Sequence, residues 1–481
     1  MKTIVLFPCL FLISLAALSA APGRSNVLFI ISDDLTATAP SCYNPGGART
    51  PAIDCLAAEG TRYTRAYCQF PVCGPSRASF MSGYYPHGSG TMGYVSGRKQ
   101  IGPDRLTWSQ YLGKHGYHTA RVSKIFHMGV PGDIERGSDG ADDPASWDER
   151  HNSRGPEWKA AGDGELLENN PDGTLKTKGG NTLEYVKADG DDLVHSDGKT
   201  AEKASELLRK FKATPEKPFF LAVGFVRPHV PFVAPRSYYD PYPWEKVTLP
   251  RKVEGDWDDI PKAGINYKTS VNLNLNERQE KKAVAAYYAS VAFLDAQVAK
   301  VLKTLEDEGL DKNTIVIFTS DHGFHLCEHN FWMKVSLMEE SVRVPLIIRV
   351  PGMKPGVCHS FVELVDLYPT VAELCGLEVP PHLQGKSIAK TLADPSHKVR
   401  DAVFSVNGNS MLLRDEDWAY IRHGRNGELG RQLYDMAKDP GQFTNLAGDP
   451  RFAEVLDKMD KRLNRRLAQV RDSDIMREAR R

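Results

Sequence analysis

The sequence predicts an α/β fold with a large, mostly parallel central sheet flanked by helices. Four short apolar runs each end in a cluster of polar residues, over 27–31, 119–122, 219–225 and 315–318. Such runs are typical of strands buried on both faces, as in parallel sheets. An amphipathic helix is predicted over 280–308, where apolar residues recur at helical spacing before Gly309. Strands that alternate with helices place the functional site beyond the carboxyl ends of the strands.

The first residues have the features of a secretory signal peptide. Lys2 is followed by an apolar stretch over 4–18 and by small residues over 19–21. This layout predicts a signal peptide over 1–21 and a secreted or periplasmic product. A membrane anchor is the alternative, but the apolar run is short for a span of about 20 residues. No later stretch is apolar enough to cross a bilayer, so no membrane span is predicted.

The charge balance excludes a general attraction to polyanions. The 481 residues include 61 Lys plus Arg and 61 Asp plus Glu. No global field therefore favours nucleic acid or anionic membranes, and an anionic substrate must be bound by local charge.

Composition along the chain predicts two domains after the signal peptide. We expect a catalytic domain over 22–395 and a smaller C-terminal α+β subdomain over 396–481, with short alternating segments and a charged helix over about 452–470. Residues 128–195 are rich in Gly, Asp, Glu and Asn and show little periodicity, which indicates substrate-facing surface loops rather than core.

The cysteines do not indicate structural zinc. Removal of the signal peptide takes Cys9 and leaves seven, so at least one stays unpaired in an exported protein. Their spacings lack the CxxC pairs of structural zinc sites.

Acidic residues follow two of the predicted strands. Asp33 and Asp34 come after the first, and Asp321 follows the strand over 315–318. Three carboxylates at neighbouring strand ends repel one another unless a divalent cation compensates them, so the sequence predicts a metal site. The alternative is a set of helix N-caps. His322 would be an unusual Ca²⁺ ligand, because calcium prefers oxygen donors.

Cationic side chains also lie at the ends of predicted strands. These residues are Arg77, Lys124, His127, His229 and Lys334. Together they could line a site for a small tetrahedral oxyanion. Taken singly, each could also be an ordinary surface cation or a hydrogen-bonded histidine. Pro75 could begin a helix that Gly83 ends, and an anion at Cys73 would then face the positive end of that helix.

Cys73-Gly74-Pro75-Ser76-Arg77 resembles the C-x-P-S-R signature of type I sulfatases, in which the cysteine is oxidised to Cα-formylglycine. The resemblance extends over nearly the whole mature chain, through SDDL at 32–35, SKIFH at 123–127, FVRPHVPF at 225–232, FTSDHGFHLCEHNFWMK at 318–334 and LVDLYPTVAELCG at 364–376. The order and spacing are most similar to the iduronate-2-sulfatase branch. The resemblance implies an alkaline-phosphatase-like sandwich.

The resemblance also implies a role for each site residue. One divalent cation, most simply Ca²⁺, would be held by Asp33, Asp34, Asp321, His322 and the formylglycine at 73. Arg77 would stabilise the formylglycine, Lys124 and His127 would orient its hydrate, and His229 and Lys334 would hold the sulfate and the leaving oxygen. Cys327 and His325 depart from the pattern of many relatives.

The implied reaction is hydrolysis of a sulfate ester on a sulfated oligo- or polysaccharide. A hydrated aldehyde has two hydroxyls: one attacks sulfur, and the second allows sulfate to leave and the aldehyde to re-form, a route that serine lacks. Maturation would need a formylglycine-generating enzyme.

Fewer sequence features indicate the substrate than indicate the reaction. We expect an exo-acting enzyme that removes a 2-O-sulfate from a terminal uronic acid, with Arg98 or Lys99 contacting the uronate carboxylate. A solvated surface turn is the alternative for these two residues. The same motifs are also compatible with a sulfatase for a different sugar, with a phosphoester or phosphonate hydrolase, and with a non-catalytic protein that binds sulfated glycans.

Overall fold

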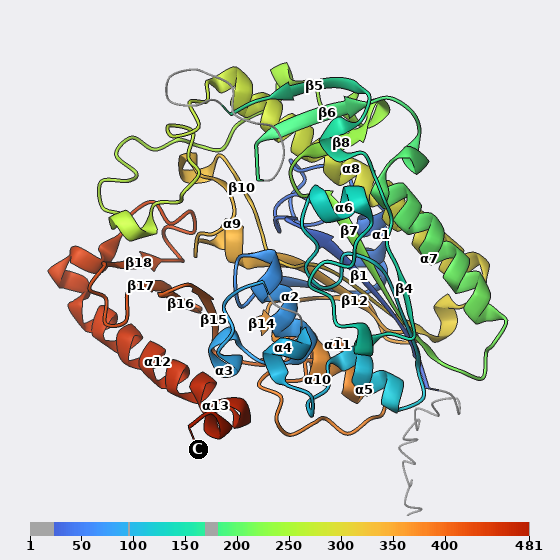
Figure 1. Cartoon of the computed structure of the whole chain (residues 1–481). Coiled ribbons are helices and arrows are strands. Elements are labelled where there is room, and N and C mark those ends of the chain that lie inside the picture. Colours follow the sequence, from blue (N-terminus) through green and yellow to red (C-terminus); the bar gives the residue numbers. More distant parts are fainter. Residues whose placement is uncertain (1–23, 95–96, 169–180, 481) are drawn as a thin grey trace, which may run out of the picture.

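The protein is described from a computed structural model, which covers residues 24–94, 97–168 and 181–480 (Figure 1). The signal peptide predicted over 1–21 lies outside the described residues.

A nine-stranded sheet forms the centre of the molecule. Its strands lie in the order β13-β2-β12-β9-β1-β7-β3-β4, and β14 also pairs with β2. All strand pairs are parallel except those that β12 makes with β9 and β2. The strands are β1 Asn26–Asp33, β2 Thr61–Tyr67, β3 His118–Ser123, β4 Glu149–His151, β7 Phe219–Pro228, β9 Thr314–Ser320, β12 Arg343–Arg349, β13 Gly356–Cys358 and β14 Val362–Glu363. The predicted α/β class and mostly parallel sheet are confirmed.

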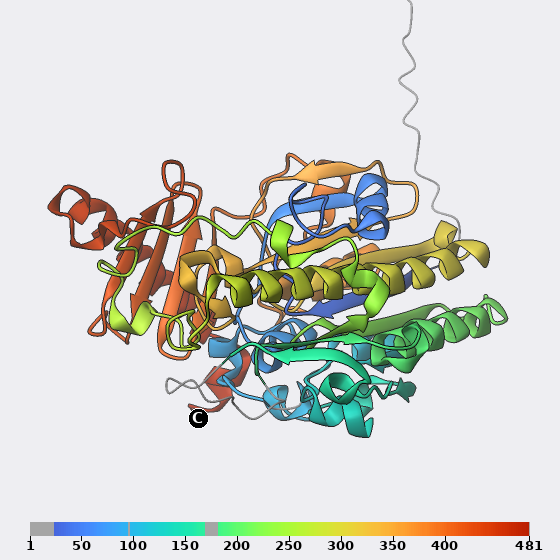
Figure 2. The ribbon, with the colours of Figure 1, turned by 90° about the horizontal axis from the view of Figure 1, so that it is seen from above.

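Helices cover both faces of this sheet (Figures 1 and 2). One face packs against α1 Pro51–Glu59, α7 Ser196–Lys212 and α8 Glu277–Asp307, and the other against α2 Cys73–Ser82, α5 Trp108–Lys114 and α10 Leu367–Leu374. Every residue of β1 is buried, which explains why its apolar run does not alternate. Shorter helices are α3 Pro86–Ser89, α4 Gly97–Ile101, α6 Gly132–Arg136, α9 Glu339–Val342 and α11 Ala389–Ala393.

The long helix α8 begins three residues earlier than predicted. Asn276 caps it by accepting from the backbone N–H of Gln279, whose side chain accepts from the backbone N–H of Asn276. Such a capping box satisfies two backbone donors that the first turn leaves free. Gly309, at φ 63°, follows its end as expected.

The interpretation of 128–195 as loops is wrong in part. This segment supplies β4 at one edge of the main sheet, and β5 Gly162–Leu166 and β6 Glu184–Ala188 of a three-stranded sheet with β8 Phe232–Pro235. Leu167 and Leu183 are buried in the main core. Apolar residues of the segment are thus buried in several clusters, which the polar composition around them concealed.

A separate four-stranded antiparallel sheet lies at the C-terminal end of the chain, to one side of the main body in Figure 2. It consists of β15 Ala402–Asn407, β16 Ser410–Asp415, β17 Trp418–His423 and β18 Arg431–Asp435, and helices α12 Ala453–Arg471 and α13 Asp474–Glu478 follow it. The smaller α+β unit is confirmed as part of the fold; its boundary at 395/396 stays a prediction.

Two further observations concern the whole described chain. None of its seven cysteines forms a disulfide, which agrees with the odd count. None of its helices combines the length and apolar character that a membrane crossing requires.

Candidate active site

Four adjacent strands deliver the predicted polar residues to one place. The sheet order β9-β1-β7-β3 places four parallel strands side by side. Asp321 and His322 follow β9. Asp33 ends β1 and Asp34 follows it. His229 follows β7, and Lys124 follows β3. Lys334 arrives from the hairpin of β10 His325–Leu326 and β11 Trp332–Met333.

The three carboxylates lie close together and are fully buried. The backbone N–H of Asp34 donates to Asp321 Oδ1 at 3.2 Å, and Asp34 has a positive φ of 66° that turns the chain sharply after β1. Burial would raise the pKa of Asp33, but Lys124, His229 and Arg77 together hold it well below its usual range. Burial raises the pKa of Asp34 despite the neighbouring Lys334.

Three permanent cations balance these carboxylates. Lys124 donates to Asp33, Lys334 Nζ lies 2.7 Å from Asp34 Oδ1, and Arg77 Nε lies 2.8 Å from Asp321 Oδ2. Three negative and three positive charges sum to zero. An added divalent cation would therefore leave two positive charges available for an anionic ligand.

Two histidines turn a lone pair toward this cluster. His322 Nδ1 lies 2.9 Å from the Gly323 carbonyl oxygen, and His229 Nδ1 lies 2.5 Å from that of Val230. A carbonyl oxygen only accepts, so Nδ1 carries the proton in each neutral ring and Nε2 is free to bind a metal or accept a hydrogen bond. His322 Nε2 lies 3.2 Å from both Asp34 Oδ1 and Cys73 Sγ.

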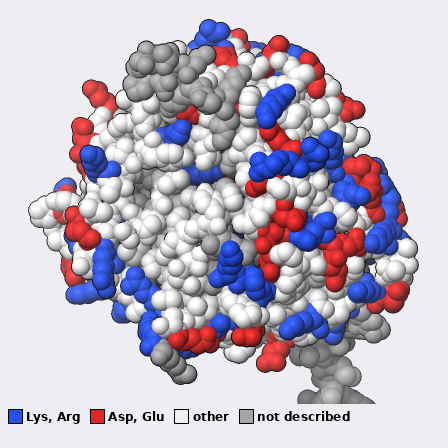
Figure 3. Space-filling model, viewed as in Figure 1, with Lys and Arg blue, Asp and Glu red and all other residues white. Residues whose placement is uncertain are grey.

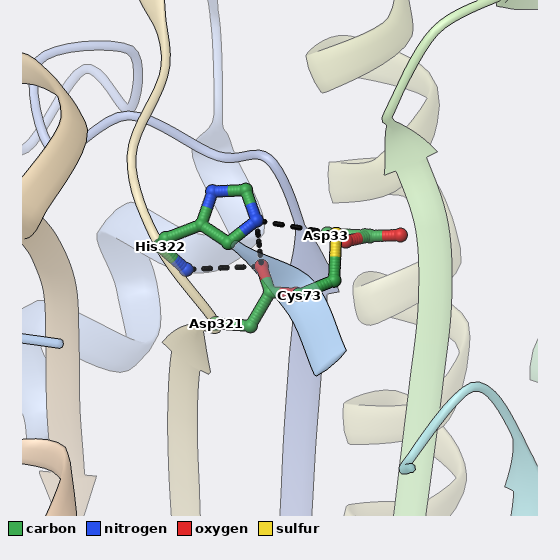
Figure 4. A group of neighbouring side chains, drawn as sticks. All are labelled: Asp33, Cys73, Asp321 and His322. Atoms are coloured by element: carbon green, nitrogen blue, oxygen red, sulfur yellow. Dashed lines mark hydrogen bonds and ion pairs between the residues drawn. The ribbon is translucent and has the colours of Figure 1, made fainter. Parts of the chain in front are cut away.

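Cys73 is the first residue of helix α2, which Gly83 ends at φ 78°. Figure 4 shows its sulfur beside Asp33, Asp321 and His322. Lys334 Nζ lies 3.3 Å from the same sulfur. Burial and Asp33 raise the pKa of this thiol well above its usual range. The unmodified side chain is therefore a neutral thiol and a poor nucleophile.

The residues present fit a divalent cation. Asp33, Cys73, Asp321 and His322 offer ligand atoms within 4.8 Å of one another, and so do Asp33, Asp34, Cys73 and His229. Asp33 Oδ1 is buried and accepts no hydrogen bond from any described residue, and its nearest ion-pair partner, Arg77 Nη2, is 3.6 Å away. A buried carboxylate oxygen without a donor is the position that a cation would satisfy.

His127 lies at the edge of the cluster. Its Nδ1 is buried and has no hydrogen-bond partner in the described structure. Burial and the nearby Lys124 lower its pKa to about 3, so the ring is neutral at pH 7.

The sulfatase family matches residues 25–377. This chain belongs to the sulfatase family. The C-terminal region of N-sulphoglucosamine sulphohydrolase matches residues 327–469. As a sulfatase, the protein hydrolyses sulfate esters.

Two relatives cover most of this sulfatase. A sulfatase from Formosa agariphila is 30% identical over 91% of this chain and 85% of its own length. The iduronate 2-sulfatase of Mus musculus is 32% identical over 91% of this chain and 79% of its own length.

Solved structures share the fold. A phosphonate monoester hydrolase from Silicibacter pomeroyi matches 94% of this chain with a TM-score of 0.75, at 22% identity and over 96% of its own chain. A 2-O GAG sulfatase matches 93% of this chain with a TM-score of 0.71, at 24% identity and over 93% of its own chain. At these identities the likeness supports the alkaline-phosphatase-like α/β architecture and no particular substrate.

The predicted substrate residues Arg98 and Lys99 lie in the short helix α4. The Arg98 guanidinium donates to the carbonyl oxygens of Gly102 at 2.9 Å and Arg105 at 2.6 Å, and forms an ion pair with Asp143 at 3.2 Å. It therefore holds its own loop together in this structure. Lys99 is exposed. Contact of either residue with substrate stays a prediction.

Sequence reasoning missed a network behind His229 in this sulfatase. Arg227 donates to the carbonyl oxygens of His229, at 3.0 Å, and Pro231, and forms a buried ion pair with Glu157. Asp197 accepts the backbone N–H groups of Val226 and Arg227 at 2.9 and 2.8 Å. Glu157 and Asp197 lie in or beside the segment predicted as surface loops, so nothing in the sequence linked them to Arg227.

Two further contacts fix the backbone of Asp321 and Asp34. Ser76 Oγ donates to the Asp321 carbonyl oxygen at 2.5 Å, and Tyr287 Oη donates to the Asp34 carbonyl oxygen at 2.7 Å. Ser76 belongs to the C-x-P-S-R motif, which could have indicated a structural role. Tyr287 was indistinguishable from the other buried residues of its helix.

Proposed function

We propose that this sulfatase removes a 2-O-sulfate from a terminal uronic acid of a glycosaminoglycan-like saccharide, through a formylglycine derived from Cys73. The observation that carries the proposal is the buried cluster of Cys73 with three carboxylates and three cations at adjacent strand ends. Likeness to mouse iduronate 2-sulfatase supports the choice of sugar.

Two groups would complete the site. A hydrated formylglycine at position 73 supplies a hydroxyl nucleophile, which the neutral thiol cannot provide. A divalent cation, Ca²⁺ by its preference for oxygen ligands, would be held by Asp33, Asp34, Asp321, His322 and the group at 73, and supplies positive charge toward the sulfate oxygens.

The residues of the chain then divide the remaining work. Asp34 holds the pKa of the Lys334 ammonium well above its usual range despite burial, so Lys334 can donate to the leaving oxygen. Burial and Lys334 hold the pKa of His229 well below its usual range, so this ring is neutral when it contacts the sulfate. The guanidinium of Arg77 and the ammonium of Lys124 each pair with a carboxylate of the same cluster, so their positive charges lie at the site. Fixed charges of this kind need no reorganisation during reaction, and the loss of one donor typically costs about 10²- to 10³-fold in rate.

Burial of the site supports action at a chain end. Cys73 and Lys334 are 1% and 3% exposed. Figure 3 shows the face of the molecule hollowed near its centre, above α2 and beside β10. A terminal sugar enters such a hollow more easily than a unit in the middle of a polymer. We further propose export through the signal peptide over 1–21, to the periplasm or the medium, and maturation by a formylglycine-generating enzyme.

Defined oligosaccharides test the function. Mass spectrometry should show loss of one sulfate from saccharides with a terminal 2-O-sulfated uronate and none from internal units. Cys73→Ala should abolish turnover, whereas the matched variant Cys68→Ala, at another buried cysteine, should keep it. Peptide mass spectrometry of active enzyme should show formylglycine at 73; active enzyme with only unmodified cysteine there contradicts the mechanism.

The same panel separates the competing functions. Cleavage of sulfated galactose or fucose instead of uronate would leave the sulfatase activity and refute the substrate. Faster turnover of a phosphonate monoester than of any sulfate ester would favour the phosphonate hydrolase, and binding without turnover would favour a glycan-binding protein. For the carboxylate contact, Lys99→Ala is a cleaner test than Arg98→Ala, because Arg98 also secures its loop. A raised KM for the uronate substrate supports the contact.

A further inference from the structure

Two tyrosines expose much of their surface. Tyr94 and Tyr267 are 54% and 46% exposed, and within the described part of the chain no other Phe, Trp or Tyr side chain is exposed to this extent. Single exposed apolar side chains are common and need no explanation. These two, however, both border the candidate active site.

Tyr94 lies over the start of helix α2. Its ring centroid is 4.3 Å from that of His127, at an interplanar angle of 51°. A Cβ atom added to Gly74 would lie 2.4 Å from Tyr94 Cδ1, so the ring packs directly on the backbone beside Cys73. Glycine at position 74 is what allows this approach.

Tyr267 lies beside Lys334. Its hydroxyl is 3.9 Å from Met333 Sδ, one residue before Lys334. The preceding residue, Asn266, donates from its side-chain amide to the carbonyl oxygens of Trp332 and Lys334, at 3.2 and 3.1 Å. These contacts fix the segment that carries Tyr267 against β11.

Both hydroxyls are protonated at neutral pH. Partial burial raises the pKa of both tyrosines to about 12.

We propose that Tyr94 and Tyr267 form the sugar subsite, in which they contact the ring of the saccharide that carries the sulfate. This inference rests on the proposed function. A pyranose has C–H groups on its faces and hydroxyls around its rim, and tyrosine offers a matching apolar ring with a polar end. Tyrosine also loses little conformational entropy when it is covered, because it has only two side-chain torsions. In this arrangement the cations bind the sulfate group, and the two tyrosine rings contact the sugar that carries it.

Binding of the sulfate and binding of the sugar ring can be tested separately by substitution. The sulfate is held by the buried cluster, whereas the sugar ring is held by the tyrosines. Tyr94→Ala and Tyr267→Ala should each raise KM for the saccharide about 3- to 10-fold, the effect of losing one aromatic contact. The inhibition constant of inorganic sulfate, which has no sugar, should stay within about 2-fold of wild type.

Kinetics with a 2-O-sulfated uronate disaccharide provide the test. Tyr94→Phe and Tyr267→Phe keep the ring and should retain KM within about 2-fold. Leu429→Ala, at an exposed apolar residue of the C-terminal region, is the matched control and should change nothing. Formylglycine content is measured for each variant and rates are expressed per formylglycine, because Tyr94 packs beside Cys73.

The outcomes distinguish this inference from the function on which it rests. Unchanged KM in both alanine variants refutes the subsite. A parallel rise in KM and in the sulfate inhibition constant also refutes it, because the tyrosines would then act on the anion site. An equal loss in the phenylalanine variants refutes ring contact. A wild-type enzyme that cleaves no sulfated saccharide refutes the proposed function itself.

Discussion

Arg227 and Arg236 provide a matched pair of ionic contacts in different surroundings. The Arg227 side chain is 2% exposed and pairs with Glu157, which is 3% exposed. The Arg236 side chain is 48% exposed and pairs with Asp163 and Asp189. We predict that Arg227→Met destabilises the protein strongly and that Arg236→Met does not.

The magnitude follows from what each substitution leaves behind. Arg227→Met leaves the buried carboxylates of Glu157 and Asp197 without their cation, and breaking a buried pair in this way costs about 3–5 kcal/mol. An unfolding entropy of about 2.1 cal/mol/K per residue over 481 residues gives about 1 kcal/mol per degree. The expected fall in Tm is therefore about 3–5 °C. Exposed pairs contribute little, so Arg236→Met should cause no measurable shift.

Thermal unfolding at two pH values checks the cause. Burial, opposed by Arg227, already raises the pKa of Asp197 to about 6. Loss of Arg227 raises that pKa further. A carboxyl whose folded pKa exceeds its unfolded value destabilises the fold above the folded pKa, and protonation relieves this cost below it. The deficit of Arg227→Met should thus be larger at pH 7.5 than at pH 5.

Catalysis gives a second measurement, because Arg227 also holds the carbonyl oxygen of His229. In the folded variant, kcat/KM should fall at least 10-fold through the displaced His229. Equal Tm shifts for Arg227→Met and Arg236→Met, or a deficit independent of pH, would refute the argument.

Two other predictions concern the metal and the site histidine. Ca²⁺ at 100 times its Kd should stabilise the protein by about 2.7 kcal/mol and raise its Tm accordingly. Asp321→Asn should show no such rise, whereas Asp240→Asn, at an exposed carboxylate, should respond like wild type. A Tm insensitive to chelation and to added Ca²⁺ would contradict the metal site. The pKa of His127 is lowered to about 3 by burial and Lys124, so the unfolded chain gains a proton below about pH 6.5 that the folded chain does not. His127→Gln should therefore lose less stability than wild type between pH 6.5 and 5, by up to about 2 kcal/mol at pH 5, and parallel stability curves for the two proteins would contradict this.

The ends of the strands made the candidate active-site cluster predictable. Asp33, Lys124, His229 and Asp321 each follow a predicted strand, and parallel strands align their carboxyl ends. The resemblance to sulfatases then implied a role for each of these residues. The structure brings these residues together with Cys73 and Lys334, although their individual roles in catalysis stay predictions.

Contacts between distant segments could not be predicted. The partners of Arg98 include Asp143 and backbone carbonyl oxygens, and they depend on how separate segments of the chain meet. Likewise, Glu157 lies in a segment whose composition resembles loop, yet it is buried because Arg227 needs a counter-ion there. Local sequence patterns carry periodicity and caps, and they do not record which loop lies against which.

The burial of Cys73 also bears on whether its modification comes before or after folding. Its side chain is 1% exposed at the start of a packed helix, beneath Tyr94. A modifying enzyme must take the cysteine and its flanking residues into its own active site, which the folded chain does not permit. The conversion proposed at 73 would therefore have to precede folding, while the segment is still extended. On this proposal, a chain that folds first would keep its thiol, and later exposure to a formylglycine-generating enzyme would not rescue it without unfolding.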